Sequence, residues 1–161
     1  MMRVLVYGYG NPGRQDDGLG IALVAKLEEW VEQQGLDGVA FERNYQLNIE
    51  DAEAISSKDL VIFADASEEE IDDFCFSEVD GRGKLAFTTH AASPGYILKL
   101  CQELFEKNPR VLLLHIKGYE WDFKEGISAR AKGNLDQAFK AMQSVLKQPG
   151  YETVFGDKTC L

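Results

Sequence analysis

The chain has 161 residues, 45% of them apolar, and its 17 basic and 27 acidic residues give a formal net charge of −10. This length suits one domain with one core. The negative charge repels nucleic-acid phosphates and anionic lipids, and no stretch approaches the roughly 18 apolar residues of a membrane span, so we expect neither nucleic acid nor membrane as a partner.

The compartment is predicted from the N-terminus and the cysteines. The first residues, "MMRVLVYGYG", lack the charged region and cleavage site of a secretory signal. The cysteines are odd in number, widely spaced and never in a CxxC pair, namely Cys75, Cys101 and Cys160. This pattern predicts a reducing compartment with no disulfide framework and no zinc knuckle, and hence the cytoplasm.

Short apolar runs predict the strands. "RVLVY" at 3–7 and "DLVIFAD" at 59–65 read as strands buried on both faces, and "RVLLLHIKGY" from 110 repeats the pattern. The alternating segments predict more exposed strands, at 39–45 and, on a sheet edge, at 73–79, with a short extended piece at 84–90.

Helices are predicted between these runs. The first follows the glycine loop, with Asp16 or Asp17 as its expected cap, and ends at Gly35. Three more are expected: a short helix capped by Asn48, a helix with Ser93 as cap and Pro94 at its first position, and a last helix that "QPG" at 148–150 stops.

The alternation of strands and helices predicts the fold. We expect an α/β protein, a three-layer α/β/α sandwich whose twisted, mostly parallel five-stranded sheet carries one antiparallel strand. Residues 1–150 are expected to form a single domain, and residues 151–161 a C-terminal tail. We expect a monomer.

The loop "VYGYGNPGRQDDGLG" could bind either a phosphate or a cation. It matches the dinucleotide pattern GxGxxG through Gly8, Gly10 and Gly13. However, Pro12 removes an amide donor, and Asp16 and Asp17 place negative charge where the phosphates would lie. The same turn can direct a carboxylate into the crevice at the carboxyl edge of the sheet, which makes Asp17 a candidate metal ligand. The alternative is that Asp16 or Asp17 only caps the helix.

Two further polar residues close predicted strands. Asp65 ends the run 59–65, and His90 ends "FTTH". Each has an ordinary alternative, a turn role for Asp65 and a surface role for His90. Together with Asp17 they form an N/O ligand set with open positions, which suits nickel, zinc or cobalt.

Other nucleophiles and aromatic residues fit structural roles better. Ser93 reads as a helix cap, and Cys101 lies on an apolar helix face. His115 is expected to be a strand residue whose ring bonds the backbone. Tyr119 and Trp121 are expected either to pack or to line a groove for a substrate. No HExxH helix is present, which excludes that type of zinc protease.

At this point the motifs resemble a known family. "GYGNPGRQDDGLG" resembles the N-terminal signature of the NiFe hydrogenase maturation endopeptidases, "FADAS" their second motif, and "TTHAASPGYIL" their histidine motif. "IKGYEWDFKEGISARAKGNL" at 116–135 is similar to their late conserved stretch. The resemblance spans nearly the whole chain, in the same order.

The resemblance implies a function and a site. The family implies a cytoplasmic protease that removes the C-terminal extension of the hydrogenase large-subunit precursor once nickel is inserted. Its nickel-contacting positions fall on Asp17, Asp65 and His90, which would act as both metal ligands and catalytic residues. Nickel would be recognised within the precursor, other divalent cations could occupy the site, and one carboxylate would act as general base in a metal-assisted hydrolysis.

Two alternatives stay open at the level of sequence. The same crevice could serve a nickel-dependent checkpoint or chaperone that does not cut, or the glycine loop could bind a nucleotide. The adjacent Asp16 also competes with Asp17 as the first ligand.

Overall fold

The computed structural model describes residues 2–81, 92–148 and 157–160. Its sheet has five strands in the order β2-β1-β3-β5-β4, namely β1 (Val4–Tyr9), β2 (Val39–Asn44), β3 (Leu60–Ser67), β4 (Phe74–Val79) and β5 (Arg110–Lys117). All neighbouring strands pair in parallel except β4, which lies antiparallel to β5 at one edge. The predicted mostly parallel sheet with one antiparallel strand is confirmed.

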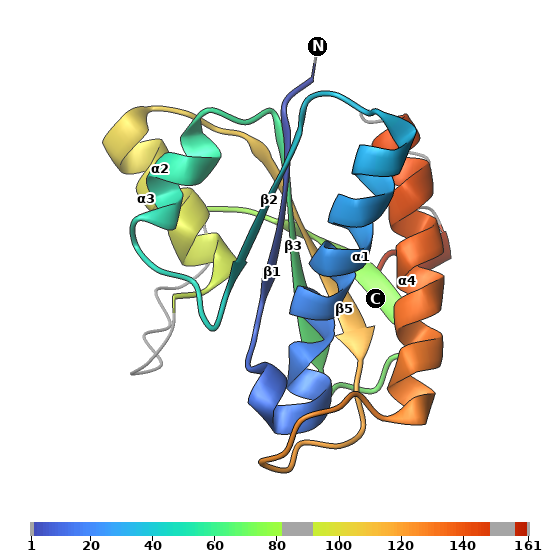
Figure 1. Ribbon diagram of the computed structural model, residues 1–161. Coiled ribbons are helices and arrows are strands. Elements are labelled where there is room, and N and C mark those ends of the chain that lie inside the picture. The colour runs from blue at the N-terminus through green and yellow to red at the C-terminus, as the bar shows by residue number, and fades with distance from the viewer. Residues whose placement is uncertain (1, 82–91, 149–156, 161) are drawn as a thin grey trace.

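Helices cover both faces of this sheet (Figure 1). One face packs against α1 (Leu19–Gln34) and α4 (Ala129–Lys147), the other against α2 (Asp51–Ser56) and α3 (Pro94–Phe105). The central strands are buried on both faces because their apolar residues face alternate helix layers: Val4 and Val6 of β1 lie on the α1 side, and Leu5 and Tyr7 on the α2 side. The three-layer α/β/α sandwich is therefore confirmed.

The ends of the helices test the sequence expectations. Gly35 ends α1 in the left-handed conformation, and Ser93 caps α3 by accepting a hydrogen bond from the Tyr96 N–H (3.1 Å). The expected aspartate cap of α1 is wrong, because the 3₁₀ segment η1 (Pro12–Gly18) precedes that helix and Gly18 occupies its cap position without a side-chain bond. The expected Asn48 cap of α2 is also wrong, since Glu50 precedes that helix.

The cysteines depart from expectation. Cys75 of β4 and Cys160 form a disulfide across 85 residues of sequence, so the expectation of no disulfide is wrong for this pair. Cys101 is free and buried. Sequence spacing could not reveal the pairing, because it depends on residues 157–160 returning to the sheet edge.

The extended piece expected at 84–90 lies outside the described residues. Within them, none of the helices combines the length and the apolar character that crossing a bilayer requires.

Candidate functional site

The glycine loop turns sharply between β1 and η1, at the carboxyl end of the parallel strands (the lower end of Figure 1). Gly10 has φ of 135°, and a side chain there would meet the Asp17 carbonyl oxygen. The backbone therefore doubles back closely, as only glycine permits. Asn11 stabilises the turn with two hydrogen bonds. Its side-chain oxygen accepts from the Gly13 N–H (2.9 Å), and its backbone N–H donates to Oδ2 of Asp17 (2.8 Å).

Asp17 and Asp65 come close enough to interact at this edge. Burial raises the pKa of the Asp65 carboxyl to about 7, and the negative charge of Asp17 contributes further. Two hydrogen bonds oppose this shift, one from the Ala66 N–H (2.8 Å) and one from the Tyr9 side chain. The structure thus brings two of the three expected ligands together.

Tyr9 is a site residue that the sequence analysis missed. It ends β1, and its side chain hydrogen-bonds Asp65 while its ring packs edge-on against Phe63 (6.3 Å between ring centres). Burial, followed by the charge of Asp65, raises the pKa of the Tyr9 hydroxyl, so this group remains a hydrogen-bond donor. Strand register brings the two residues together: Gly8 pairs with Ala64, so the next residues along β1 and β3 are Tyr9 and Asp65. No sequence pattern gives this register.

Asp16 has a different role from its neighbour. Its side chain is fully buried, and its carboxylate accepts hydrogen bonds from the backbone N–H groups of Tyr119 (2.8 Å), Glu120 (3.0 Å) and Ser128 (2.7 Å) and from the Ser128 hydroxyl (2.8 Å). Burial alone would raise the pKa of Asp16, but these bonds together outweigh it and hold the pKa below its ordinary value. A carboxylate satisfied in this way is committed to the loop after β5, which leaves Asp17 as the ligand candidate.

Two neighbours of Asp16 in η1 also bind the loop that follows β5. Gln15 adopts a left-handed φ of 48° and exchanges hydrogen bonds with this loop, donating to the Lys124 carbonyl (2.9 Å) and accepting from the Asp122 N–H (3.1 Å). Arg14 donates to the Trp121 carbonyl (3.2 Å) and lies over the Phe123 ring. The motif "IKGYEWDFKEGIS" therefore acts as a support that fixes the glycine loop.

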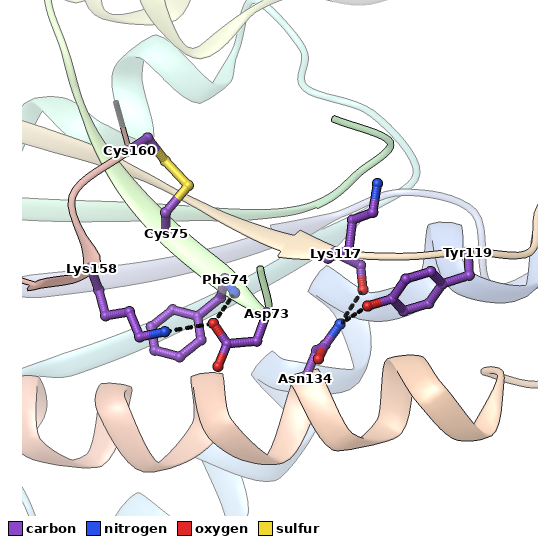
Figure 2. Close-up of polar contacts among 8 residues, drawn as sticks. All are labelled: Asp73, Phe74, Cys75, Lys117, Tyr119, Asn134, Lys158 and Cys160. Carbon is purple, nitrogen blue, oxygen red and sulfur yellow. Dashed lines mark hydrogen bonds and ion pairs between the residues drawn. A yellow bond between two sulfur atoms is a disulfide. The ribbon is translucent and has the colours of Figure 1, made fainter. Parts of the chain in front are cut away.

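Tyr119 packs within this support. Its hydroxyl accepts a hydrogen bond from the Asn134 amide (2.9 Å), which also donates to the Lys117 carbonyl (Figure 2). The Arg130 guanidinium lies 4.1 Å from the centre of the Tyr119 ring. Of the two expectations for Tyr119, these contacts favour packing.

His90, the third expected ligand, lies outside the described residues. Among the described residues, no group of three or more His, Cys, Asp or Glu side chains is arranged to hold a metal ion. Whether the described residues suit a metal ion therefore depends on the chemistry of the two carboxylates, Asp17 and Asp65. A cation beside Asp17 and Asp65 would stabilise the ionised form of Asp65, because a positive charge opposes both causes of its raised pKa, burial first and the charge of Asp17 second.

His115 lies beside Asp65 in the sheet but bonds elsewhere. The two residues are partners across β3 and β5, and the Nε2 atom of His115 lies 2.8 Å from the Ser77 hydroxyl on β4. Burial lowers the pKa of His115. The expectation of a backbone partner is wrong, because β4 places a serine diagonally opposite the ring.

The other nucleophile candidates are unsuited to catalysis. Ser93 is engaged as the cap of α3. Cys101 is fully buried, and this burial raises the pKa of its thiol, which disfavours the reactive thiolate.

Comparison with solved structures adds to this geometry. The chain is similar to the NiFe hydrogenase maturation protease HycI from Thermococcus kodakarensis KOD1, with a TM-score of 0.73 and 20% identity over 91% of this chain and 94% of that one. It is similar to the hydrogenase maturating endopeptidase HybD from E. coli, with a TM-score of 0.71 and 19% identity over 92% and 94%. A third likeness is to a hydrogenase 2 maturation peptidase from Thaumarchaeota archaeon SCGC_AB-539-E09, with a TM-score of 0.65 and 22% identity over 89% and 97%.

At the level of sequence, no protein-family model and no curated protein matches the chain. The likeness to the solved structures nevertheless extends over about nine-tenths of the chain, in the architecture that the motifs predicted. The chain therefore has the fold of the NiFe hydrogenase maturation proteases, the family that its motifs resemble.

Proposed function

We propose that the chain is an endopeptidase that removes the C-terminal extension of a NiFe hydrogenase large-subunit precursor after nickel insertion. The fold is that of solved maturation proteases. The observation that carries the proposal is the pair of carboxylates, Asp17 and Asp65, at the carboxyl edge of the sheet, where burial and, second to it, the charge of Asp17 raise the pKa of Asp65 to about 7. Such a pair favours a cation, and nickel held by the precursor is the cation that the fold family implies.

The two carboxylates would serve the substrate in different ways. Asp17, Asp65 and His90 would complete the coordination of nickel already bound by the precursor, so that only a loaded precursor docks productively. Nickel held in this way would supply Lewis-acid chemistry, by polarising a carbonyl or lowering the pKa of a water molecule. One of the two carboxylates, Asp65 in this proposal, would act as general base towards a water molecule. Tyr9 would orient that carboxylate through its hydrogen bond.

Cleavage assays on nickel-loaded and metal-free precursor test the proposal. We expect the wild-type protein to cleave only the loaded precursor, and the variants Asp17→Asn, Asp65→Asn and His90→Ala to lose cleavage. Glu125→Gln, which changes an exposed carboxylate in the loop after β5, is the matched control and should cleave normally.

Each contrary outcome has a distinct meaning. Equal cleavage of loaded and metal-free precursor would refute recognition of nickel. Binding of the loaded precursor without cleavage would favour the checkpoint alternative. A rise in melting temperature with NAD but not with nickel or cadmium would favour a nucleotide site. The cytoplasmic location and the monomeric state stay predictions.

A further inference from the structure

The Cys75–Cys160 disulfide is a feature that the proposed function does not use. It joins the edge strand β4 to residues 157–160, near the C-terminal end of the chain (Figure 2). The third cysteine, Cys101, lies buried in the core between α3 and the sheet. The chain therefore places one specific pair of sulfur atoms at the sheet edge.

Residues 157–160 also contact β4 through a short backbone bridge and an ion pair. Cys160 donates its backbone N–H to the Phe76 carbonyl (2.8 Å), and Thr159 forms an isolated parallel bridge with Phe76. The Lys158 ammonium donates to Oδ1 of Asp73 (2.6 Å) and lies 4.6 Å from the centre of the Phe74 ring (Figure 2). A partly exposed ion pair contributes about 1 kcal/mol or less.

These contacts reach the loop that joins β3 to β4. Asp73, the partner of Lys158, ends this loop, and its carbonyl accepts a hydrogen bond from the Lys117 N–H (2.9 Å). The Lys117 ammonium donates to the carbonyls of Glu68 (2.9 Å) and Glu69 (2.5 Å). The C-terminal segment is therefore braced on the loop that directly follows β3, the strand that carries Asp65.

A groove of about 650 Å³ lies between the loop and the segment. Both cysteines line it, together with Glu69, Glu70, Ile71, Asp72, Phe74, Asp157, Lys158 and Thr159. Since Asp157 to Cys160 supply one side of this groove, its shape depends on where they lie.

We propose that Cys75 and Cys160 form a reversible redox latch. As a disulfide, the pair fastens residues 157–160 over the outer edge of β4. A dithiol reductant breaks the sulfur–sulfur bond, giving two electrons and two protons to form two thiols while the reductant itself becomes a disulfide. The segment then leaves the edge strand, because the short bridge between Thr159 and Phe76 and the partly exposed Lys158 ion pair are weaker holds than the covalent bond, and the edge of β4 and the groove are uncovered. Reversible disulfides in reducing compartments commonly have such sensing roles.

Alkylation and hydrogen exchange test the latch in the full-length protein. After incubation with oxidised glutathione and denaturation, N-ethylmaleimide should add once, at Cys101, and after reduction with dithiothreitol it should add three times. In the folded protein, the C-terminal peptide that contains Cys160 should be protected from hydrogen exchange when oxidised and should exchange at least tenfold faster when reduced. Cys160→Ser should exchange like the reduced wild-type protein under both conditions.

Cys101→Ala is the matched control, since it removes the cysteine that the latch does not use and should keep both the disulfide and the redox-dependent protection. The comparison of oxidised and reduced wild-type protein needs no substitution, so a poorly folded variant cannot obscure the result. Failure of the pair to oxidise, or equal protection of the C-terminal peptide in both states, would overturn the proposal.

Discussion

Asp16 and Asp17 are adjacent in the sequence, but the fold gives them opposite environments. Asp16 is fully buried and bonds three backbone N–H groups of the loop after β5, whereas Asp17 is partly exposed and accepts from Asn11. The carboxylate of Asp16 therefore holds the glycine loop in place, which leaves Asp17 as the proposed ligand. No local pattern distinguishes the two, because the difference arises from a loop more than 100 residues away.

Asp16→Ala should destabilise the protein strongly. The substitution leaves the N–H groups of Tyr119, Glu120 and Ser128 without their acceptor, so we expect the free energy of unfolding to fall by about 3–5 kcal/mol. Urea denaturation followed by circular dichroism at pH 7 measures this loss. Asp17→Ala removes the hydrogen bond from the Asn11 N–H and should change the free energy of unfolding by less than about 1 kcal/mol. Equal losses in both variants would contradict the separate roles.

Asp65 should make stability depend on pH. Its folded pKa of about 7 lies above the unfolded value of about 3.9. Between these values the folded protein holds a proton that the unfolded chain has released, so stability falls as the pH rises through this window and the cost is complete above about pH 7. Asp65→Asn removes the cost and should be more stable than wild type by about 2–4 kcal/mol at pH 8, with little difference near pH 4.

Urea titrations at both pH values, in the presence of a metal chelator, measure this difference. Asp72→Asn, at an exposed position in the loop before β4, is the matched control and should show no such dependence. A stability gain for Asp65→Asn that is the same at pH 4 and pH 8 would show that the carboxyl is not perturbed in the folded protein.

At the scale of elements, the close packing of α1 on the sheet depends on glycine. A side chain at Gly20 would meet the Ala64 carbonyl oxygen and lie 3.0 Å from that of Tyr9, so the start of α1 rests directly on β1 and β3. This approach keeps η1 next to Asp65. Gly8, the first glycine of the dinucleotide pattern, takes part in the same contact, because a side chain there would meet the Gly20 carbonyl oxygen. Helix–sheet packing therefore requires this glycine without a phosphate.

Gly20→Ala and Gly133→Ala form a contrasting pair within helices. Gly20→Ala should lower the free energy of unfolding by roughly 2 kcal/mol or more, because backbone atoms cannot move aside easily. Gly133 of α4 is exposed and has no atom within 4 Å of an added Cβ, so Gly133→Ala should raise it by up to about 1 kcal/mol. Thermal melts of the two variants beside wild type provide the measurement. A gain for Gly20→Ala would refute the close approach.

At the scale of the whole molecule, the disulfide links the edge strand to the end of the chain. It closes a loop of 85 residues, and a cross-link over a loop of this length restricts the unfolded chain. Reduction should therefore lower the free energy of unfolding by roughly 2–4 kcal/mol while the sheet stays folded. Urea midpoints of oxidised and reduced protein test this expectation, and Cys101→Ala should respond to reduction as wild type does. Identical midpoints in the two states would contradict it.

Residue patterns were enough to predict the main strands and helices and to point to a candidate site. The buried runs of β1, β3 and β5, the Gly35 terminus and the Ser93 cap are local, because apolar periodicity and capping act within a few residues. The expectation that Asp17 and Asp65 meet followed from a general property of parallel sheets, whose carboxyl ends share one edge.

Only the tertiary structure decided which side chains meet over long sequence distances. It separated the roles of Asp16 and Asp17, placed Tyr9 against Asp65, paired His115 with Ser77 and joined Cys75 to Cys160. Each contact depends on strand register or on the return of a distant segment, and neither leaves a periodic signal along the chain. The sequence therefore determined the layers and the edge where the candidate site lies, and packing between distant segments decided which side chains meet there.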